Sequence, residues 1–279
     1  MVYLLSKHGM VRSVSDFLIQ TIQELQRFSC FQHFGLGGGT SLAIRYQHRQ
    51  SYDIDLFTKQ IIDEKMYSTI QKELHHFYGA DSIAICISKN PVEHLKSYRI
   101  QIHQDGTYSK IDLLQNTPLL DSFQQESEIQ MLSLEDIGVL KLMSANQRGS
   151  KKDIYDLDTI TDKIPLVDLM ERLQRMDQIH NIQDYSLLFG CLPKETLLQN
   201  PSRLHFIENI KSDYDRGFFE VEEIHAIQGL HWPHAEASWD VKVLSYLYEI
   251  GLEKIYAKTI DQLTQRIEER TKKDHGLYL

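Results

Sequence analysis

Hydrophobic positions in the first half of the chain follow helical spacing in some stretches and strand spacing in others. Over residues 13–28 apolar side chains recur every three or four positions after a serine that can cap a helix. The same spacing predicts a helix over residues 63–78. Short apolar or alternating runs predict strands over residues 31–36, 52–57, 82–88, 98–103 and 108–114. The last two flank Asp105-Gly106, a dipeptide typical of β-hairpin turns.

From residue 134 onward the pattern changes, because helical spacing dominates and convincing strands are absent. It predicts helices over residues 134–147, 152–161 and 166–176, and a last helix over 252–272. We therefore predict an α+β fold with two domains. Residues 1–132 are expected to form a small, largely sequential mixed sheet with flanking helices. Residues 133–279 are expected to form a helical domain.

Composition narrows the class of protein. The 279 residues are 42% hydrophobic and 25% charged, which is ordinary for a globular chain, and the formal net charge is −9. A nucleic-acid partner would therefore need a local basic patch. Three cysteines, Cys30, Cys86 and Cys191, are far apart and odd in number, so we expect reduced thiols and neither disulfides nor a zinc site. With no signal-peptide run and no membrane span, we expect a cytoplasmic protein.

Two aspartates in one predicted strand are the first candidates for chemistry. Because side chains alternate along a strand, Asp53 and Asp55 should lie on one face and Ile54 and Leu56 on the other. Two neighbouring carboxylates repel each other unless a cation lies between them, and hard divalent cations prefer oxygen ligands. The alternative is a solvated edge strand.

A glycine-rich turn precedes these aspartates. Gly37, Gly38 and Gly39 lead into Thr40 and Ser41 at the start of a short helical segment. Backbone N–H groups at a helix start, with the two hydroxyls, are suited to binding the phosphates of a nucleotide. The alternative is a plain turn. No Gly-Lys-Ser/Thr follows, so this is not a P-loop.

A third carboxylate occurs in another predicted strand. Alternation places Asp112 on one face with Tyr108 and Lys110, while Ile111 and Leu113 face the core. A carboxylate within an apolar strand is costly unless it is paired or binds a metal. Its strand can lie beside that of Asp53 and Asp55, and we interpret Asp112 as a third metal ligand or the group that accepts the proton of an acceptor hydroxyl. The alternative is a salt bridge to a neighbouring lysine.

A basic stretch follows in the helical half. Lys141 and Arg148 are two helical turns apart and share a face, where they can neutralise a triphosphate, and Lys151 and Lys152 extend the stretch. The alternative is a solvated basic face with local ion pairs. Asp153 and Asp156 are expected to orient these cations rather than to react. His225, His231 and His234 show no metal-ligand spacing and are expected to be surface or core histidines.

These motifs resemble those of a known family. The first two are Gly38-Gly39-Thr40-Ser41-Leu42 and Asp53-Ile54-Asp55-Leu56-Phe57, with Lys110-Ile111-Asp112 beyond them. The third block is Lys141 on a helix, then Arg148, then Lys152-Asp153-Ile154-Tyr155-Asp156-Leu157. Together they are similar to the DNA polymerase β-like nucleotidyltransferase superfamily and, more narrowly, to the AbiEii toxin family. The resemblance spans about residues 30–160 and implies a nucleotidyltransferase-like N-terminal domain.

The resemblance and the residues together give a hypothesis of metal-dependent nucleotidyl transfer. Asp53, Asp55 and Asp112 are the expected metal ligands, for Mg²⁺ or Mn²⁺, and are catalytic together with Lys141. The expected nucleotide-binding residues are Gly38, Gly39, Thr40, Ser41, Lys141, Arg148 and Lys152. The substrate is a nucleoside triphosphate. The resemblance implies a toxin with a cognate antitoxin and a tRNA acceptor, and we expect no membrane partner. The alternatives are nucleotidylation of a small molecule or protein, and a catalytically silent nucleotide-binding regulator.

Overall fold

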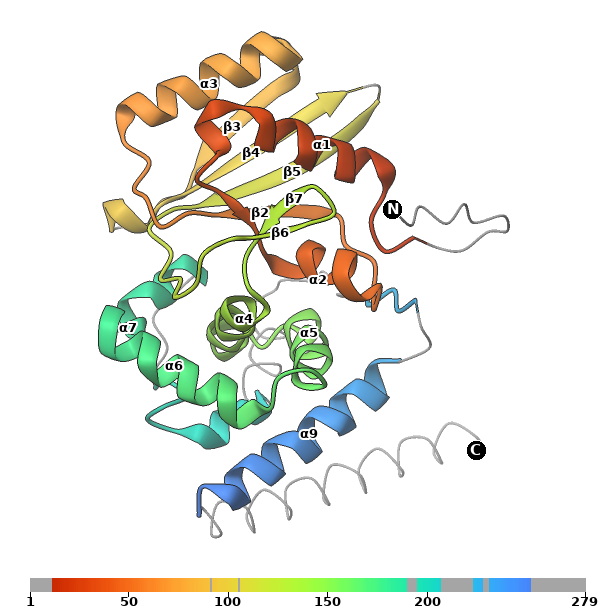
Figure 1. Ribbon diagram of the computed structural model, residues 1–279, viewed down its shortest axis with the longest axis vertical. Helices are drawn as coiled ribbons and strands as arrows, with labels where there is room; N and C mark the ends of the chain where they lie inside the picture. Colours follow the sequence, from red (N-terminus) through yellow and green to blue (C-terminus); the bar gives the residue numbers. More distant parts are fainter. Residues whose placement is uncertain are drawn as a thin grey trace, which may run out of the picture.

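A computed structural model describes residues 12–90, 92–104, 106–189, 195–206, 223–227 and 231–251. In these residues the strands form one seven-stranded sheet in the order β3-β4-β5-β2-β1-β7-β6, with helices packed on both sides (Figure 1). The α+β prediction is confirmed. The predicted helix 252–272 and Cys191 lie outside the described residues, whereas Cys30 and Cys86 are free thiols.

The sheet is mixed. Its strands are β1 Gly35–Leu36, β2 Asp53–Phe57, β3 Ile83–Ile87, β4 Ser97–Gln104, β5 Thr107–Leu114, β6 Gln124–Glu126 and β7 Ile129–Met131. β2 runs parallel to β5 and antiparallel to β1, and β4 and β5 form the predicted hairpin. The predicted sequential order is wrong at its centre. The chain completes α3, β3 and β4 before β5 returns to pair with β2, since parallel strands need a crossover connection.

Two amphipathic helices cover one face of the sheet (Figure 1). They are α1 Asp16–Arg27 and α3 Glu64–Tyr78. The predicted serine cap of α1 is Ser15, which accepts a hydrogen bond from a backbone N–H of the first turn, and Asp63 caps α3 in the same way. Ile22 and Leu74 are fully buried in a hydrophobic cluster that also contains Ile54, Ile100 and Ile111. This face of the sheet is therefore closed.

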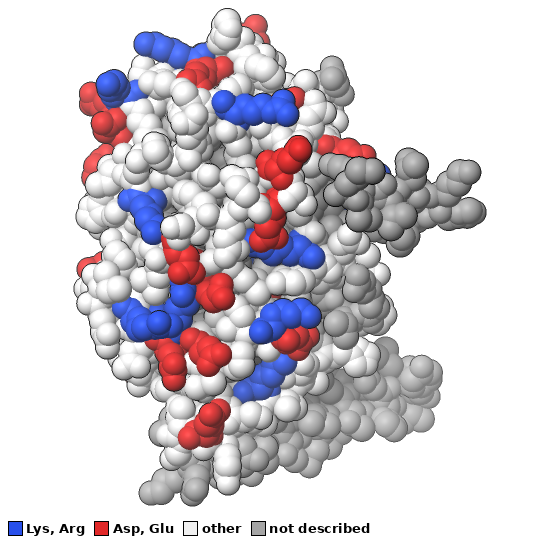
Figure 2. Space-filling model, in the orientation of Figure 1, with Lys and Arg blue, Asp and Glu red and all other residues white. Residues whose placement is uncertain are grey.

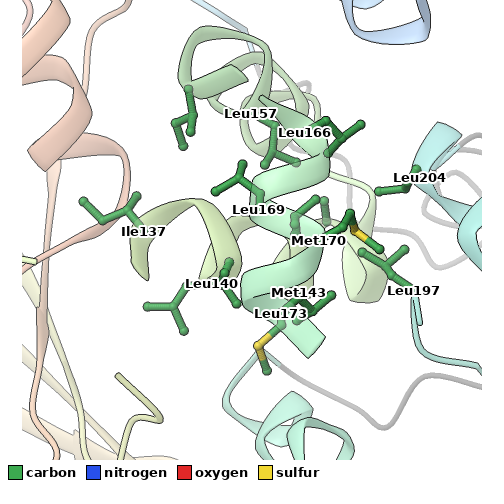
Figure 3. Packing of buried hydrophobic residues seen from close by; sticks show 14 of the residues in the cluster. Ile137, Leu140, Met143, Leu157, Leu166, Leu169, Met170, Leu173, Leu197 and Leu204 are labelled. Carbon is green, nitrogen blue, oxygen red and sulfur yellow. The ribbon is translucent and has the colours of Figure 1, made fainter. Parts of the chain in front are cut away.

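The other side of the sheet meets the helical half. Its helices are α2 Gly38–Tyr46, α4 Leu134–Arg148, α5 Lys151–Thr161, α6 Leu166–His180, α7 Ile182–Tyr185 and α9 Trp232–Glu249. Helix α4 is buried on all sides from Asp136 to Gln147 and forms the centre of a second hydrophobic cluster. Figure 3 shows Leu140 and Met143 of α4 packed against Leu169 and Leu173 of α6. Phe57 and Leu114 join this cluster from the sheet. The two-domain division stays a prediction.

Two local predictions need correction. The run 31–36 forms a strand only at Gly35–Leu36, after a 3-10 helix at Ser29–Phe31, because a run this short, with Gln32 and His33 together between apolar residues, does not alternate as a strand does. The β6–β7 hairpin was not predicted. Its turn residues, Ser127 and Glu128, have φ angles of 50° and 66°, without the glycine or asparagine that usually marks such turns.

The remaining short elements are 3-10 helices. They span Ala80–Ser82, Glu93–Leu95, Ser186–Phe189 (η4) and Pro201–His205. Among the described residues, no helix combines the length and apolar character needed to cross a lipid bilayer.

Candidate active site

The parallel pairing of β2 and β5 brings the predicted carboxylates together. Asp55 is the direct partner of Asp112 in the register, and Asp53 is the partner of Lys110. Ile54 and Ile111 point to the opposite face and are fully buried. The alternation inferred from the sequence is therefore confirmed, and three acidic side chains from two strands share one face of the sheet.

The central carboxylate of the three lies in an unfavourable field for an anion. Burial, followed by the negative charges of Asp112 and Asp53, raises the pKa of Asp55 to about 6. Lys141 and Lys110 oppose this shift but do not cancel it. The arrangement has more negative charge at its centre than its neighbours neutralise, and a cation bound there would relieve it.

Two cations from the same sheet face contact the outer carboxylates. The Lys110 ammonium lies 3.2 Å from Asp53 Oδ2 and 3.6 Å from Asp112 Oδ2. The Arg99 guanidinium donates two hydrogen bonds to Asp112, of 2.7 and 3.0 Å. The ion pair to a neighbouring lysine, which was the alternative interpretation of Asp112, is thus present together with the carboxylate cluster.

Arg99 was missed in the sequence, although a signal for it existed. In the hairpin register, His103 pairs with Tyr108 and, four residues further, Arg99 pairs with Asp112. The cross-strand partner of a candidate catalytic carboxylate is therefore readable from the dipeptide that predicts the hairpin.

The glycine turn packs directly against the central carboxylate. Gly37 donates its backbone N–H to the Asp55 carbonyl over 2.9 Å, and α2 begins at Gly38. Gly38 has a φ of +61°, and a Cβ there would lie 2.0 Å from Asp55 Oδ2. A side chain at this position would fill the space beside the carboxylate. The first N–H groups of α2 have no partner within the helix itself, so the turn offers anion-binding donors next to Asp55.

The hydroxyls of Thr40 and Ser41 do not face this space, which corrects their expected phosphate contact. Both residues are fully buried. Thr40 donates to the Asp53 carbonyl and lies 2.8 Å from the Ser51 hydroxyl, while Ser41 accepts a 2.6 Å hydrogen bond from Arg45. In this structure the two hydroxyls tie the glycine turn to β2 and to α2.

A second charge cluster lies behind the first, inside the helical half. The Lys141 ammonium is 2.8 Å from Asp153 and 2.7 Å from Asp156, and Arg148 donates 2.8 and 3.2 Å hydrogen bonds to Asp153. Both aspartates are fully buried, so this is not the solvated basic face of the alternative interpretation. The expectation that they orient the cations agrees with this geometry.

Residues of the N-terminal half complete the second cluster. The Arg49 guanidinium makes two 2.7 Å hydrogen bonds to Asp156, and His48 Nε2 lies 2.7 Å from the same carboxylate. A Cβ on Gly39 would lie 2.2 Å from Arg49 Nη2. Asp156 therefore links α5 to the segment between α2 and β2, and the glycine turn touches both charge clusters.

Charge balance fixes the ionisation of the second cluster. Burial tends to lower the pKa of Lys141, but Asp153 and Asp156 outweigh it and the pKa rises above its ordinary value. Burial likewise tends to raise the pKa of both aspartates, yet Lys141, with Arg148 or Arg49, holds each below its usual range. These directions favour the charged forms of Lys141, Asp153 and Asp156.

A cavity of about 530 Å³ lies between the sheet and the helical half, within the range of small-ligand sites. Its charged lining residues include Asp55, Asp112, Arg99, Lys141 and Arg148, and Gly38 also lines it. Apolar residues complete the lining, among them Leu140 of α4 and Leu187–Phe189 of η4. The cavity therefore combines two of the three predicted carboxylates with the glycine turn and two predicted cations, while Asp53 is not among its lining residues.

Other candidates lie elsewhere among the described residues. Lys152 does not line the cavity, and the Lys151 ammonium lies 5.8 Å from the centroid of the Trp232 ring. His225, His231 and His234 are exposed, as expected.

The comparison with protein families agrees with the motifs. A model described as nucleotidyl transferase AbiEii toxin, type IV toxin–antitoxin system, matches residues 22–223, well over half of the chain. The chain belongs to the AbiEii family. The stretch of this AbiEii protein that matches includes the glycine turn, all three carboxylates and both charge clusters.

This AbiEii family member is also similar to an uncharacterised protein of Aquifex aeolicus (strain VF5). The two are 28% identical over 147 residues, which cover 50% of this chain and 62% of the relative. The chain thus spans less than two thirds of the curated relative that it matches.

The site of this AbiEii protein has the donor chemistry for a hard divalent cation. Asp55 and Asp53 would offer carboxylate oxygens to such a cation beside the glycine turn. Asp112 adjoins them, but its oxygens accept hydrogen bonds from Arg99. Within the described part of the chain, no three histidine, cysteine or acidic side chains already form a metal-binding group. The residues fit a cation that displaces Arg99 or that uses Asp53 and Asp55 first.

Proposed function

We propose that the protein is the nucleotidyltransferase toxin of a toxin–antitoxin system and moves a nucleoside monophosphate from a triphosphate to an acceptor hydroxyl. The observation that supports this most strongly is the in-register pairing of Asp55 with Asp112, beside Asp53, on the wall of a cavity. Lys141 and Arg148 lie on the same cavity. A silent nucleotide-binding regulator does not need three clustered carboxylates.

Each residue has a role in the proposed transfer. Asp53 and Asp55 would hold Mg²⁺ or Mn²⁺, which when bound would neutralise the triphosphate and make the α-phosphorus more electrophilic. The N–H groups of Gly38 and Gly39 position phosphate oxygens. Asp112 accepts the proton of the acceptor hydroxyl while the oxygen of that hydroxyl forms a bond to the α-phosphorus.

The leaving group is stabilised on the helical side of the cavity. The bond between the α-phosphorus and the bridging oxygen breaks, and pyrophosphate leaves with that electron pair. Lys141 and Arg148 neutralise the negative charge that develops on it. Asp153 holds both cations in place, at 2.8 Å from Lys141 and 2.8 Å from Arg148.

The acceptor that we favour is tRNA, with a small molecule or a protein side chain as the rivals. The net charge is −9, and Figure 2 shows acidic and basic side chains interspersed on one face of the molecule without a broad basic patch. Binding of RNA would then depend on a few local contacts. Transfer to RNA should weaken with added salt, whereas salt-insensitive transfer would favour a small acceptor.

The proposal is tested by label transfer. Purified protein is incubated with total RNA, Mg²⁺ or Mn²⁺ and each α-labelled triphosphate in turn. We expect Asp55→Asn to lower transfer by at least about 100-fold, because oxyanion- and metal-type stabilisation is worth that much in related chemistries. Asp81→Asn is the matched control, since Asp81 is an exposed aspartate outside the cavity. Equal transfer by wild type and Asp55→Asn would refute the proposed site.

Toxicity is tested separately. Induced expression of the wild type should arrest bacterial growth, and Asp55→Asn should not. Co-expression of a cognate antitoxin, sought next to the gene, should restore growth. Growth arrest that is unchanged in Asp55→Asn would show that transfer at this site is not the cause.

A further inference from the structure

The β4–β5 hairpin has one buried face and one exposed face, and the exposed face continues outward from the carboxylates. On the buried face, Ile100, Ile102 and Ile111 are fully buried under α1 and α3. The opposite face presents Arg99, Gln101 and His103 from β4 and Tyr108, Lys110 and Asp112 from β5. Only the buried face of the hairpin contributes to the hydrophobic core. The side chains on the opposite face, called here the exposed row, can therefore bind a ligand.

An aromatic pair ends this row at the tip of the hairpin. Tyr108 is 62% exposed, and its ring is stacked on that of its cross-strand partner His103, with centroids 6.0 Å apart and planes 30° apart. Cross-strand pairing alone explains the stack. Cross-strand pairing does not explain why so exposed a tyrosine lies on the same strand face as Asp112. A flat, rigid ring pair in water is a surface on which a nucleobase can stack.

The two ends of the row differ in access. At the inner end, Leu114 and Phe57 are buried against the helical half, and the cavity lies between them and α4. At the outer end, Thr107 and Tyr108 are exposed. If the triphosphate occupies the cavity, an acceptor can reach Asp112 along the exposed face of the hairpin.

The spacing along the row suits a chain-like acceptor. Tyr108 and Asp112 are four residues apart on one strand, which is roughly 13 Å at the rise of a β-strand. A small acceptor with its hydroxyl at Asp112 would not reach Tyr108. A strand with its terminal hydroxyl at Asp112 would extend past Tyr108.

A cation lies between the two ends of the row. The Lys110 side chain is 28% exposed and contacts Asp53 and Asp112 at 3.2 and 3.6 Å. Ion pairs of this exposure contribute little and exchange readily. Lys110 can therefore turn from the carboxylates to a phosphodiester that passes over the strand.

We propose that the exposed face of the hairpin, Tyr108, His103 and Lys110, binds the unpaired 3′ end of a nucleic-acid acceptor. Tyr108 and His103 stack on a base a short distance from the end, Lys110 contacts a phosphate, and the terminal hydroxyl reaches Asp112. This inference rests on the proposed function, because it assigns the acceptor to the same transfer site.

Binding without triphosphate tests the surface directly. Fluorescence anisotropy of the full-length protein is measured with an RNA hairpin that has an unpaired 3′ extension and with the same hairpin ending blunt. We expect Tyr108→Ala to weaken binding of the extended RNA at least about 10-fold and Tyr108→Trp to preserve it, since stacking depends on ring area. Tyr248→Ala, at a tyrosine that is 64% exposed on α9, is the matched control and should bind as the wild type does. Equal binding by Tyr108→Ala and the control, or equal binding of blunt and extended RNA, would overturn the proposal.

Label transfer separates this inference from the proposed function. Tyr108→Ala should raise the KM for the extended RNA at least about 10-fold while leaving the thermal shift caused by nucleoside triphosphate unchanged. If no acceptor is labelled but Tyr108 still governs RNA binding, the proposed transfer fails and the surface stands. If RNA, a protein or a small molecule is labelled equally by wild type and Tyr108→Ala, the surface fails and the transfer stands.

Discussion

Two groups of aspartates touch the same glycine turn, and their surroundings differ. Asp55, in contact with Gly38, belongs to an open group with Asp53 and Asp112, whose cations reach it from an exposed sheet face. Asp156, with Asp153, belongs to a closed group, and its partner Arg49 contacts Gly39. The side chain of Arg99 in the open group is 53% exposed, whereas that of Arg49 in the closed group is 5% exposed.

The pKa values of the aspartates are shifted in opposite directions in the two groups. Burial and neighbouring carboxylates raise the pKa of Asp55, while neighbouring cations lower the pKa of Asp153 and Asp156 despite their burial. The closed group contains Lys141, Arg49 and Arg148 for two carboxylates. A carboxylate group saturated with internal cations stabilises the fold. One left short of cations is suited to bind a cation from solution.

The largest effect should come from removing a carboxylate of the closed group. Asp156→Asn leaves the buried charges of Arg49 and Lys141 short of a counter-ion, and breaking a buried pair in this way costs about 3–5 kcal/mol. We expect the free energy of unfolding, measured by urea denaturation at pH 7 without metal, to fall by that amount.

The matched variant in the open group is Asp112→Asn. Its partner Arg99 is exposed, so the loss should be at most about 1 kcal/mol. A smaller loss for Asp156→Asn than for Asp112→Asn would invert the comparison and show that the buried pairs are not structural.

Acid should weaken the closed group next. The folded-state pKa of Asp153 and of Asp156 is lowered, so each contributes stability that is complete above its unfolded pKa of about 3.9 and is lost as pH falls below it. Each such group loses about 1.4 kcal/mol per pH unit in that range.

Urea denaturation at pH 6, 4 and 3 measures this loss. The difference in unfolding free energy between wild type and Asp156→Asn should be constant from pH 6 to about 4 and narrow at pH 3, since the variant lacks one titrating group. A difference that widens at pH 3 would contradict the lowered pKa.

Much of the fold was predictable because local signals agree with it. Ser15 and Asp63 cap helices at the predicted starts, and the two strands expected on either side of the Asp105-Gly106 dipeptide pair with each other. The β6–β7 hairpin was missed because each strand has only three residues, β6 is polar throughout, and the turn at Ser127 and Glu128 has no such signal. The sequential strand order was wrong at its centre, although the strand of Asp112 was expected beside that of Asp53 and Asp55, where β5 does lie. The pairing of β1 with β7 was missed, since it joins Leu36 to Met131 across 95 positions of chain.

In the candidate site too, some residues were predictable from local sequence patterns and others were not. Period-two alternation was enough to place Asp53 and Asp55 on one face of their strand and Asp112 opposite Ile111 in its own, and the parallel pairing of β2 with β5 brings the three together. Arg99 could have been found from the hairpin register but was missed. The contact between Arg49 and Asp156 joins residues 107 positions apart across the two halves of the chain, so no local pattern could predict it.

The smallest expected effect tests the open group's shortage of cations. In the wild type, the Arg99 guanidinium binds both Asp112 oxygens and places a positive charge near Asp53 and Asp55. Arg99→Gln removes this positive charge. Because the pair is exposed, the free energy of unfolding should change by less than about 1 kcal/mol. Affinity for Mn²⁺, measured by calorimetric titration without nucleotide, should rise about 5-fold, the equivalent of that energy.

Two controls make this outcome specific. Arg12→Gln removes an arginine that is exposed and paired with Asp16 outside the site, and it should leave Mn²⁺ affinity unchanged. Arg99→Gln combined with Asp112→Asn should lose the gain, because the released carboxylate is what binds the ion. Weaker Mn²⁺ binding by Arg99→Gln alone would mean that the arginine holds Asp112 in a ligating orientation. The open group would then resemble the closed one, with its cations acting as permanent supports for the carboxylates.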